Sequence, residues 1–197
     1  AAISEDNGIG APAPDDAAPV WQPPKAIHSF PWFEMVMTVI GVLGIIGLTL
    51  YMLTPEATGY FALVKTTLLA LIPLVIVVGF LIRIDRWEPE PWKTKISVFL
   101  WGAGVATLSA GILNTALHHN IAYSTGDAQG ASALSATFVA PLVEETLKGV
   151  VVLIVVLVRR TSINSVLDGV VYAGFSAAGF MFTEDILYFL RGEAEGT

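Results

Sequence analysis

The 197-residue chain contains no cysteine, and charged residues make up only 14% of it. Without cysteine it can form no disulfide, no thiolate zinc site and no thiol nucleophile. A soluble domain typically carries about 25% charged residues, whereas here 54% of the residues are hydrophobic. Acidic residues outnumber basic ones by 17 to 10, which argues against nucleic acid as a partner because Lys and Arg must neutralise a phosphate backbone. The composition predicts a membrane protein whose chemistry depends on carboxylates, histidines and hydroxyls.

The two ends of the chain differ from its apolar middle. Residues 1–32 hold six of the eleven prolines and four acidic residues, and bury too little apolar surface to offset their ordering entropy. We therefore predict a disordered, acidic, Pro-rich cytoplasmic tail at 1–32 and a transmembrane domain at 33–192. The chain begins without Met and ends in the polar stretch 193–197. We interpret 193–197 as the start of an outer loop in a longer protein.

Five stretches are long and apolar enough to cross a bilayer as helices, which takes about 20 residues each. They lie at about 33–53, 66–84, 96–117, 133–158 and 165–190. We therefore expect an all-α fold, a polytopic membrane helix bundle with about five transmembrane helices. Small residues on the first and third stretches favour close helix packing in lipid; these are Gly41, Gly44, Gly47, Gly102, Gly104, Ala106, Ala110 and Gly111.

The distribution of Lys and Arg predicts the orientation. Seven of them lie on the side of the N-terminal tail: Lys25, Arg83, Arg86, Lys93, Lys95, Arg159 and Arg160. Only Lys65 and Arg191 lie on the opposite side. Because cytoplasmic loops carry the excess of Lys and Arg, we expect the N-terminus in the cytoplasm.

Six charged residues interrupt the last two stretches, namely Glu144, Glu145, Lys148, Asp168, Glu184 and Asp185. A charge at the membrane centre costs about 2.5–3.5 kcal/mol even on the lenient insertion scale, so function is the default explanation. Lys148 lies one helical turn from both Glu144 and Glu145. Its ammonium can neutralise one carboxylate while the other holds and releases a proton, as a general base must. The alternative is an ion pair that fixes helix packing.

The spacing of the carboxylates limits which of them can share a site. Asp168 and Glu184 are about 24 Å apart along one helix, so one site cannot use both. We expect a site in the outer half of the membrane built from Glu144, Glu145 and Glu184, with Asp168 as a cytoplasmic-end cap or loop contact. His118 and His119 can ligate a metal, although an interfacial polar cap is the commoner role of such a pair. We expect Ser176 to lie on a helix-packing face and not to act as a nucleophile.

Two short motifs resemble those of a known family. Pro141–Lys148 contains Glu-Glu-x-x-Lys and Phe180–Glu184 contains Phe-x-x-x-Glu. On consecutive membrane helices in this order, they resemble the PrsW family of prokaryotic intramembrane proteases. That family belongs to a superfamily with type II CAAX-prenyl endopeptidases and bacteriocin-processing enzymes. Asp168-Gly169 and the segment Asp85–Pro91 also resemble family members, so the similarity covers most of the chain after residue 60.

The resemblance implies a role for each motif residue. Glu144 and Glu145 would activate water for peptide hydrolysis, with Lys148 as their electrostatic partner and Glu184 as a ligand or polariser. A divalent metal such as Zn, held by Glu145 and Glu184, is implied as the cofactor. The implied substrate is a membrane-anchored protein, and the implied location is the inner membrane of a prokaryote.

The sequence departs from the family pattern in two ways. Asp185 follows Glu184 where many relatives have Asn, and the third motif, His-x-x-x-Asp, does not occur up to Thr197. We therefore expect a chain truncated before that motif, or a relative that is not a peptidase. Our leading hypothesis is a membrane-embedded, glutamate-dependent, metal-assisted protease. The alternatives are a non-catalytic subunit of a larger membrane complex and, ranked last, a proton or ion path.

Overall fold

The computed structural model describes residues 31–52, 60–159, 163 and 165–195. The predicted tail at 1–32 therefore lies outside the described residues except for residues 31 and 32, which begin the first helix. The described part of the chain is helical and contains no strand, which confirms the predicted all-α class. In chain order its helices are α1 (Pro31–Met52), α2 (Tyr60–Ile84), α3 (Trp92–Leu100), η2 (Trp101–Ala106), α4 (Thr107–Thr125), α5 (Ala128–Leu134), η3 (Ser135–Val139), α6 (Ala140–Val158) and α7 (Val166–Glu195).

Four helical stretches within the described residues are long and apolar enough to span a membrane: Trp32–Tyr51, Tyr60–Ile84, Trp92–Thr125 and Val166–Glu193. They correspond to four of the five predicted spans. The fifth, 133–158, falls in α5, η3 and α6, and it is not among the four. The 19 residues of α6 include Glu144, Glu145 and Lys148, and these charges set this helix apart.

Some predicted helix ends differ from the observed ones. The third span continues from Trp92 to Thr125 through the π-helical segment η2. It ends where Gly126 adopts a left-handed conformation (φ 68°), which glycine reaches without steric cost. The side chain of Asp127 then accepts a hydrogen bond from the Gly130 amide at 2.9 Å and caps α5. At the other end of the chain, α7 continues to Glu195, into the predicted outer loop.

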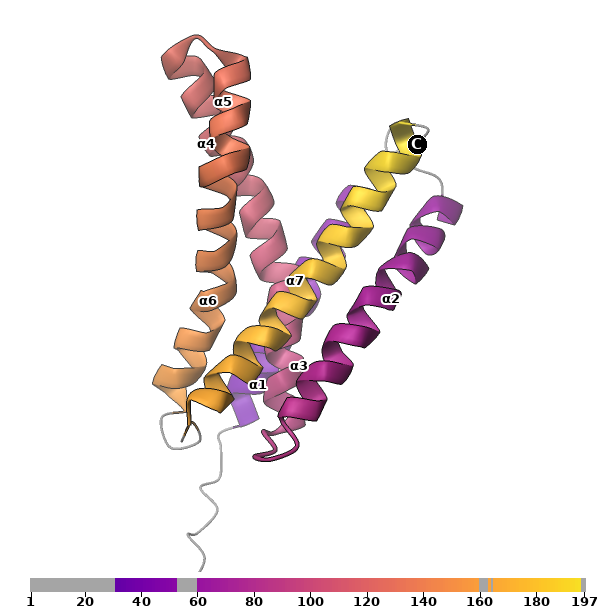
Figure 1. Cartoon of the computed structure of the whole chain (residues 1–197), viewed down its shortest axis with the longest axis vertical. Helices are drawn as coiled ribbons and strands as arrows, with labels where there is room; N and C mark the ends of the chain where they lie inside the picture. The colour runs from indigo at the N-terminus through magenta and orange to yellow at the C-terminus, as the bar shows by residue number, and fades with distance from the viewer. Residues whose placement is uncertain (1–30, 53–59, 160–162, 164, 196–197) are drawn as a thin grey trace, which may run out of the picture.

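Figure 1 shows how the helices are arranged. α2 and α7 run side by side, α3 and η2 lie between α1 and α7, and α4, α5 and α6 form an arm that leans away from α7 towards the top of the view. We call the lower end of this view the basic end. Here α2 ends and α3 begins, and the exposed side chains of Arg83, Arg86 and Lys93 lie there. The opposite end, where α4 gives way to α5, is the far end.

The helices approach most closely at η2, where glycines replace side chains. A Cβ atom on Gly102 would overlap the carbonyl oxygen of Ser176 on α7, and one on Gly104 would overlap the carbonyl oxygen of Gly41 on α1. The prediction of small-residue packing is therefore confirmed for these positions. A Cβ on Gly111 would meet nothing within 4 Å, so that glycine is not needed for packing.

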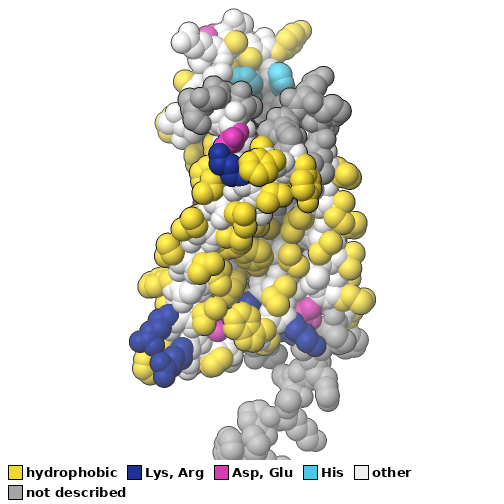
Figure 2. All heavy atoms as spheres, turned by 90° about the vertical axis from the view of Figure 1, so that its right-hand side faces the viewer, with side chains coloured by type: hydrophobic (Ala, Val, Ile, Leu, Met, Phe, Trp, Pro, Cys, Tyr) yellow, Lys and Arg dark blue, Asp and Glu magenta, His cyan; other side chains and the backbone are white. Residues whose placement is uncertain are grey.

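The molecule buries aliphatic and aromatic side chains between α2, α3, α6 and α7, including Leu81, Val98, Val151 and Phe175. Large hydrophobic side chains also cover the outside, and Figure 2 shows them across the middle of one face, with Lys and Arg near its lower edge. Lipid is the solvent that such a surface requires. This core holds α6 against α7, and with it the charged residues of both helices.

Candidate active site

The charged residues of α6 face in different directions. Glu144, Glu145 and Lys148 share one turn, because residues three and four apart are neighbours on a helix. The Nζ atom of Lys148 lies 3.8 Å from Oε2 of Glu144 and 2.9 Å from Oε1 of Glu145. The side chains of Glu144 and Lys148 are 21% and 16% exposed, whereas that of Glu145 is 74% exposed. The predicted glutamate pair is therefore asymmetric, with Glu144 turned inward and Glu145 turned outward.

Lys148 connects this turn to the second motif on α7. Its Nζ atom lies 4.0 Å from the centre of the Phe180 ring, a cation–π contact. Glu184 follows Phe180 by one turn on the same face of α7. Its half-buried carboxyl lies within electrostatic reach of Glu144 and Lys148. The structure thus brings Glu144, Lys148 and Glu184 together from two helices.

Asn114 on α4 is a member of this cluster that sequence reasoning missed. Its Nδ2 atom donates a hydrogen bond to Oε1 of Glu144 at 3.5 Å, and its Oδ1 atom is buried without a partner among the described residues. The sequence did contain a signal for this residue, since Asn114 is a single amide in the middle of an apolar stretch. A polar group inside a membrane is costly unless it has a function, so its presence there indicates a role. Three helices therefore contribute to the site around Glu144.

Two side chains from neighbouring helices hold the backbone of the motif turn. The indole Nε1 of Trp101 donates to the carbonyl oxygen of Leu147, and the hydroxyl of Ser176 donates to that of Lys148, each at 3.0 Å. Ser176 is fully buried in this contact, as expected for a packing residue. These bonds fix the position of α6 along α7, and with it the distance between the two motifs.

Asp168 lies apart from the cluster, about 24 Å of helix away from Glu184. Asp168 forms a capping box with Ser165: its carboxylate accepts the Ser165 amide at 3.0 Å, and the Ser165 hydroxyl accepts the Asp168 amide at 3.3 Å. Of the two predicted roles of Asp168, a helix cap or a loop contact, these hydrogen bonds show the helix cap. His118 is half-buried and His119 exposed, with ring centroids 5.7 Å apart. Asp185 is half-buried beside Glu184.

A second polar cluster, at the basic end, was not predicted. Arg159 pairs with Glu34 at 2.5 Å and donates to the Thr94 hydroxyl at 2.8 Å. Lys95 pairs with Asp85. From the sequence, Arg159 and Lys95 are expected to be loop charges, because nothing in the sequence alone shows that a charge near a helix end is buried. These ion pairs tie α1, α3 and the end of α6 together.

Glu90 belongs to the same end of the molecule and accepts a hydrogen bond from the hydroxyl of Tyr172. Burial raises the pKa of the Glu90 carboxyl above its ordinary value; the bond from Tyr172 opposes this shift, and the nearby charge of Asp168 adds to it. The loop between α2 and α3 is thereby fastened to α7.

These features define an integral, all-α membrane protein in which three helices share a half-buried carboxylate–ammonium cluster. Residues 90–197, more than half of the chain, match the family described as "PrsW family intramembrane metalloprotease", and the chain belongs to this family. The resemblance drawn from the two motifs is confirmed.

One curated relative supports the same assignment. The chain is 31% identical over 121 residues to a protein named protease PrsW from Clostridioides difficile (strain 630). The match covers 61% of this chain and 49% of that protein, so the chain spans about half the length of the relative. No solved structure matches the chain.

Proposed function

We propose that this chain is part of a membrane-embedded protease that hydrolyses peptide bonds with water activated by Glu144. The observation that carries the proposal is the convergence of Glu144, Lys148 and Glu184 from α6 and α7. Family membership supports it as well. A structural ion pair would need only Lys148 and one carboxylate, whereas this cluster keeps a second carboxylate within electrostatic reach.

The proposed chemistry divides the work between the two inward carboxylates. Glu144 takes a proton from water as the water oxygen attacks the scissile carbonyl carbon. The carbon–nitrogen bond then breaks, and the leaving amine receives a proton from a carboxyl of the cluster. Lys148 stabilises the negative charge that remains on the carboxylates, and Glu184 is the second carboxylate that holds or polarises the reacting group. Glu145 is largely exposed, and it assists by forming an ion pair that keeps the Lys148 ammonium in position.

The proposal includes a substrate class and a location. The apolar surface supports a lipid environment, and the family supports a membrane-anchored protein as the substrate. We place the protein in the inner membrane of a prokaryote with its N-terminus in the cytoplasm, because the exposed Arg83, Arg86 and Lys93 gather at one end. The active cluster then lies towards the outer side, since Glu144 is about 21 Å of helix away from the end of α6.

Metal assistance is a separate part of the proposal and rests on the family description. Catalytic zinc sites use three protein ligands, and the described residues contain no group of three His, Asp or Glu side chains that could hold an ion. Glu145 and Glu184 therefore do not complete a metal site with their described neighbours, and no step above is assigned to a metal. Elemental analysis of purified full-length protein tests the ligand role: Glu184→Gln should lower the content of divalent metal, and an unchanged content would exclude Glu184 as a ligand.

Sequencing of protein N-termini in isolated membranes tests the protease function for any membrane-anchored substrate. Cells that make the full-length wild-type protein should contain new N-termini of membrane-anchored proteins, and cells that make Glu144→Gln should lack them. Asp185→Asn is the matched control, because it removes a neighbouring carboxylate and should leave the cleavage products in place. Identical N-termini in the wild type and Glu144→Gln, together with a stoichiometric partner on purification, would favour a non-catalytic subunit.

A further inference from the structure

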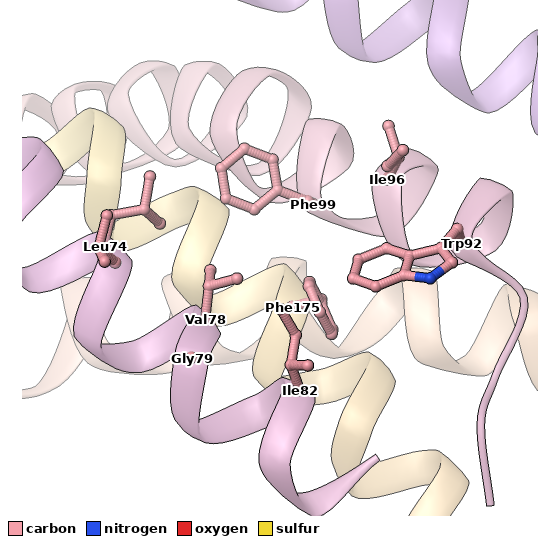
Figure 3. Close-up of a pocket in the computed structure, with 9 residues that line it drawn as sticks. Leu74, Val78, Gly79, Ile82, Trp92, Ile96, Phe99 and Phe175 are labelled. Atoms are coloured by element: carbon pink, nitrogen blue, oxygen red, sulfur yellow. The ribbon is translucent and has the colours of Figure 1, made fainter. Parts of the chain in front are cut away.

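A cavity of about 460 Å³ opens between α2, α3 and α7 near the basic end. Its walls are apolar: Leu74, Val78 and Ile82 come from α2, Ile96 and Phe99 from α3, and Phe175 from α7. Figure 3 shows the side chains of α3 and α7 facing those of α2 across this space. The volume lies within the range of about 300–1,000 Å³ that is usual for small-ligand sites. An apolar chain is the chemistry that such walls accept.

The cavity continues into a second hollow of about 420 Å³ at the end of α2. The two share Gly79, Ile82 and Trp92, so they form one continuous groove. The second hollow is more polar than the first, and its lining includes Arg83 and Arg86. The groove is thus apolar along the helices and basic at its mouth.

The charges at the mouth do not cancel. Asp85 also lines it, but its carboxylate is paired with the buried Lys95 and accepts the Glu90 amide at 3.1 Å. Arg83 and Arg86 are exposed, and neither has a hydrogen bond or ion pair with any part of the chain that the structure describes. Two guanidinium groups therefore remain available to a ligand, and guanidinium binds phosphate with paired hydrogen bonds.

We propose that this groove binds an anionic phospholipid. One acyl chain lies in the apolar cavity between α2 and α3, and the headgroup phosphate lies at the mouth between Arg83 and Arg86. Trp92 lines both halves of the groove, where an amphipathic ring favours the boundary between hydrocarbon and headgroup. A neutral apolar segment of a partner protein would fit the cavity but would leave both guanidinium groups without a counter-charge. The charge of the mouth therefore selects the lipid.

The lipid site is separate from the proposed active cluster. Phe175, at the floor of the groove, and Glu184 are about 13 Å apart along α7. Lipid binding and peptide hydrolysis can therefore be tested independently, and the failure of one does not decide the other.

Native mass spectrometry of the full-length protein in detergent micelles tests the headgroup contact, because no charged bilayer surface is then present. Phosphatidylglycerol and phosphatidylcholine are the two probes, and the wild type should retain more of the former. Arg83→Gln and Arg86→Gln should each lower the retained phosphatidylglycerol about fivefold, as expected when one basic contact is lost. Lys93→Gln is the matched control, since it removes an exposed cation outside the groove, and should change binding less than about twofold. Equal retention of both lipids by the wild type, or equal losses in all three variants, would overturn the proposal.

A second pair of variants tests the acyl-chain contact. A Cβ atom on Gly79 would meet nothing within 4 Å, so Gly79→Leu can extend into the groove without a backbone clash. It should displace phosphatidylglycerol, whereas Gly111→Leu, at an equally open helix position away from the groove, should not. Soluble glycerol phosphate should not compete with the lipid. Unchanged lipid binding in Gly79→Leu would overturn the placement of the acyl chain in the cavity. Full competition by glycerol phosphate would show that the mouth binds a free anion and not a lipid.

Discussion

At the scale of single residues, the two adjacent glutamates of the first motif have different surroundings. The Glu144 side chain is 21% exposed, next to Asn114 and Lys148, whereas that of Glu145 is 74% exposed. A general base must lie where its proton transfer is sheltered from bulk solvent and aimed at the substrate. We therefore propose Glu144 as the base and a supporting role for Glu145.

This asymmetry predicts unequal effects of the same substitution. Glu144→Gln should lower kcat/KM by about 10²-fold or more, the usual contribution of a general base. Glu145→Gln should lower it by less than about tenfold, because an exposed partner of Lys148 contributes about 1 kcal/mol or less. Cleavage rates of a membrane-anchored substrate by the full-length variants give both values. A larger loss in Glu145→Gln would reverse the assignment.

The raised pKa of the Glu90 carboxyl, at the basic end, predicts that the stability of the folded protein depends on pH. Its pKa is raised in the folded protein by burial, so the folded state holds the proton more tightly than the unfolded state. The contribution of Glu90 to stability is therefore greatest below its ordinary pKa of 4.5 and falls as the pH rises through the folded-state value. Glu90→Gln cannot titrate, so its melting temperature relative to the wild type should increase as the pH rises from 4.5. A difference that is constant with pH would contradict this explanation.

At the scale of helices, contacts between backbones determine where α1, η2 and α7 meet. Gly41, Gly102 and Gly104 leave no room for a Cβ atom, since their neighbours are backbone atoms that cannot rotate away. The hydrogen bonds of Trp101 and Ser176 to α6 then determine the position of the first motif, on α6, relative to the second motif, on α7. The site therefore depends on residues that carry no charge.

Two alanine substitutions compare a crowded glycine with an open one. Gly104→Ala should destabilise the protein by about 1–3 kcal/mol, the usual cost of overpacking. Gly111→Ala should be neutral or stabilise it by up to about 1 kcal/mol, because alanine favours the helix and nothing lies within 4 Å of its Cβ. Unfolding in detergent measures both changes. Equal stabilities of the two variants would show that the approach of α1 to η2 is not tight.

At the scale of the whole molecule, two polar clusters occupy different depths of an apolar bundle. The cluster at the basic end joins α1, α3 and the end of α6 through Glu34, Thr94 and Arg159. The cluster around Glu144 joins α4, α6 and α7. We expect the first to maintain the bundle and the second to act on substrate.

The pair of Glu34 and Arg159 allows a test of that structural role. Arg159→Met should cost about 3–5 kcal/mol of unfolding free energy, because it leaves the Glu34 carboxylate buried without its counter-charge. The double variant Glu34→Leu with Arg159→Met should recover most of the loss, since it removes both charges. Unfolding of the single and double variants in detergent measures the coupling. A double variant no more stable than Arg159→Met would contradict the explanation.

Much of the fold could be predicted because membrane helices follow from apolar length alone. The Glu144–Lys148 contact followed from helical spacing, and the second motif followed from the family resemblance. Asn114, Trp101 and the buried Glu34–Arg159 pair could not be predicted in the same way. Their roles depend on which helix faces which, and a single sequence does not determine how helices rotate against one another. For the same reason, the different exposures of Glu144 and Glu145 became visible only in the folded molecule.

The most direct test of the central claim is the cleavage of a fluorogenic transmembrane peptide by purified full-length protein in liposomes. The wild type and Asp185→Asn should cleave the peptide at similar rates, whereas Glu144→Gln and Glu184→Gln should each lose activity by about 10²-fold or more while remaining folded. Cleavage by Glu144→Gln at the wild-type rate would contradict the claim that the cluster of α6 and α7 activates water.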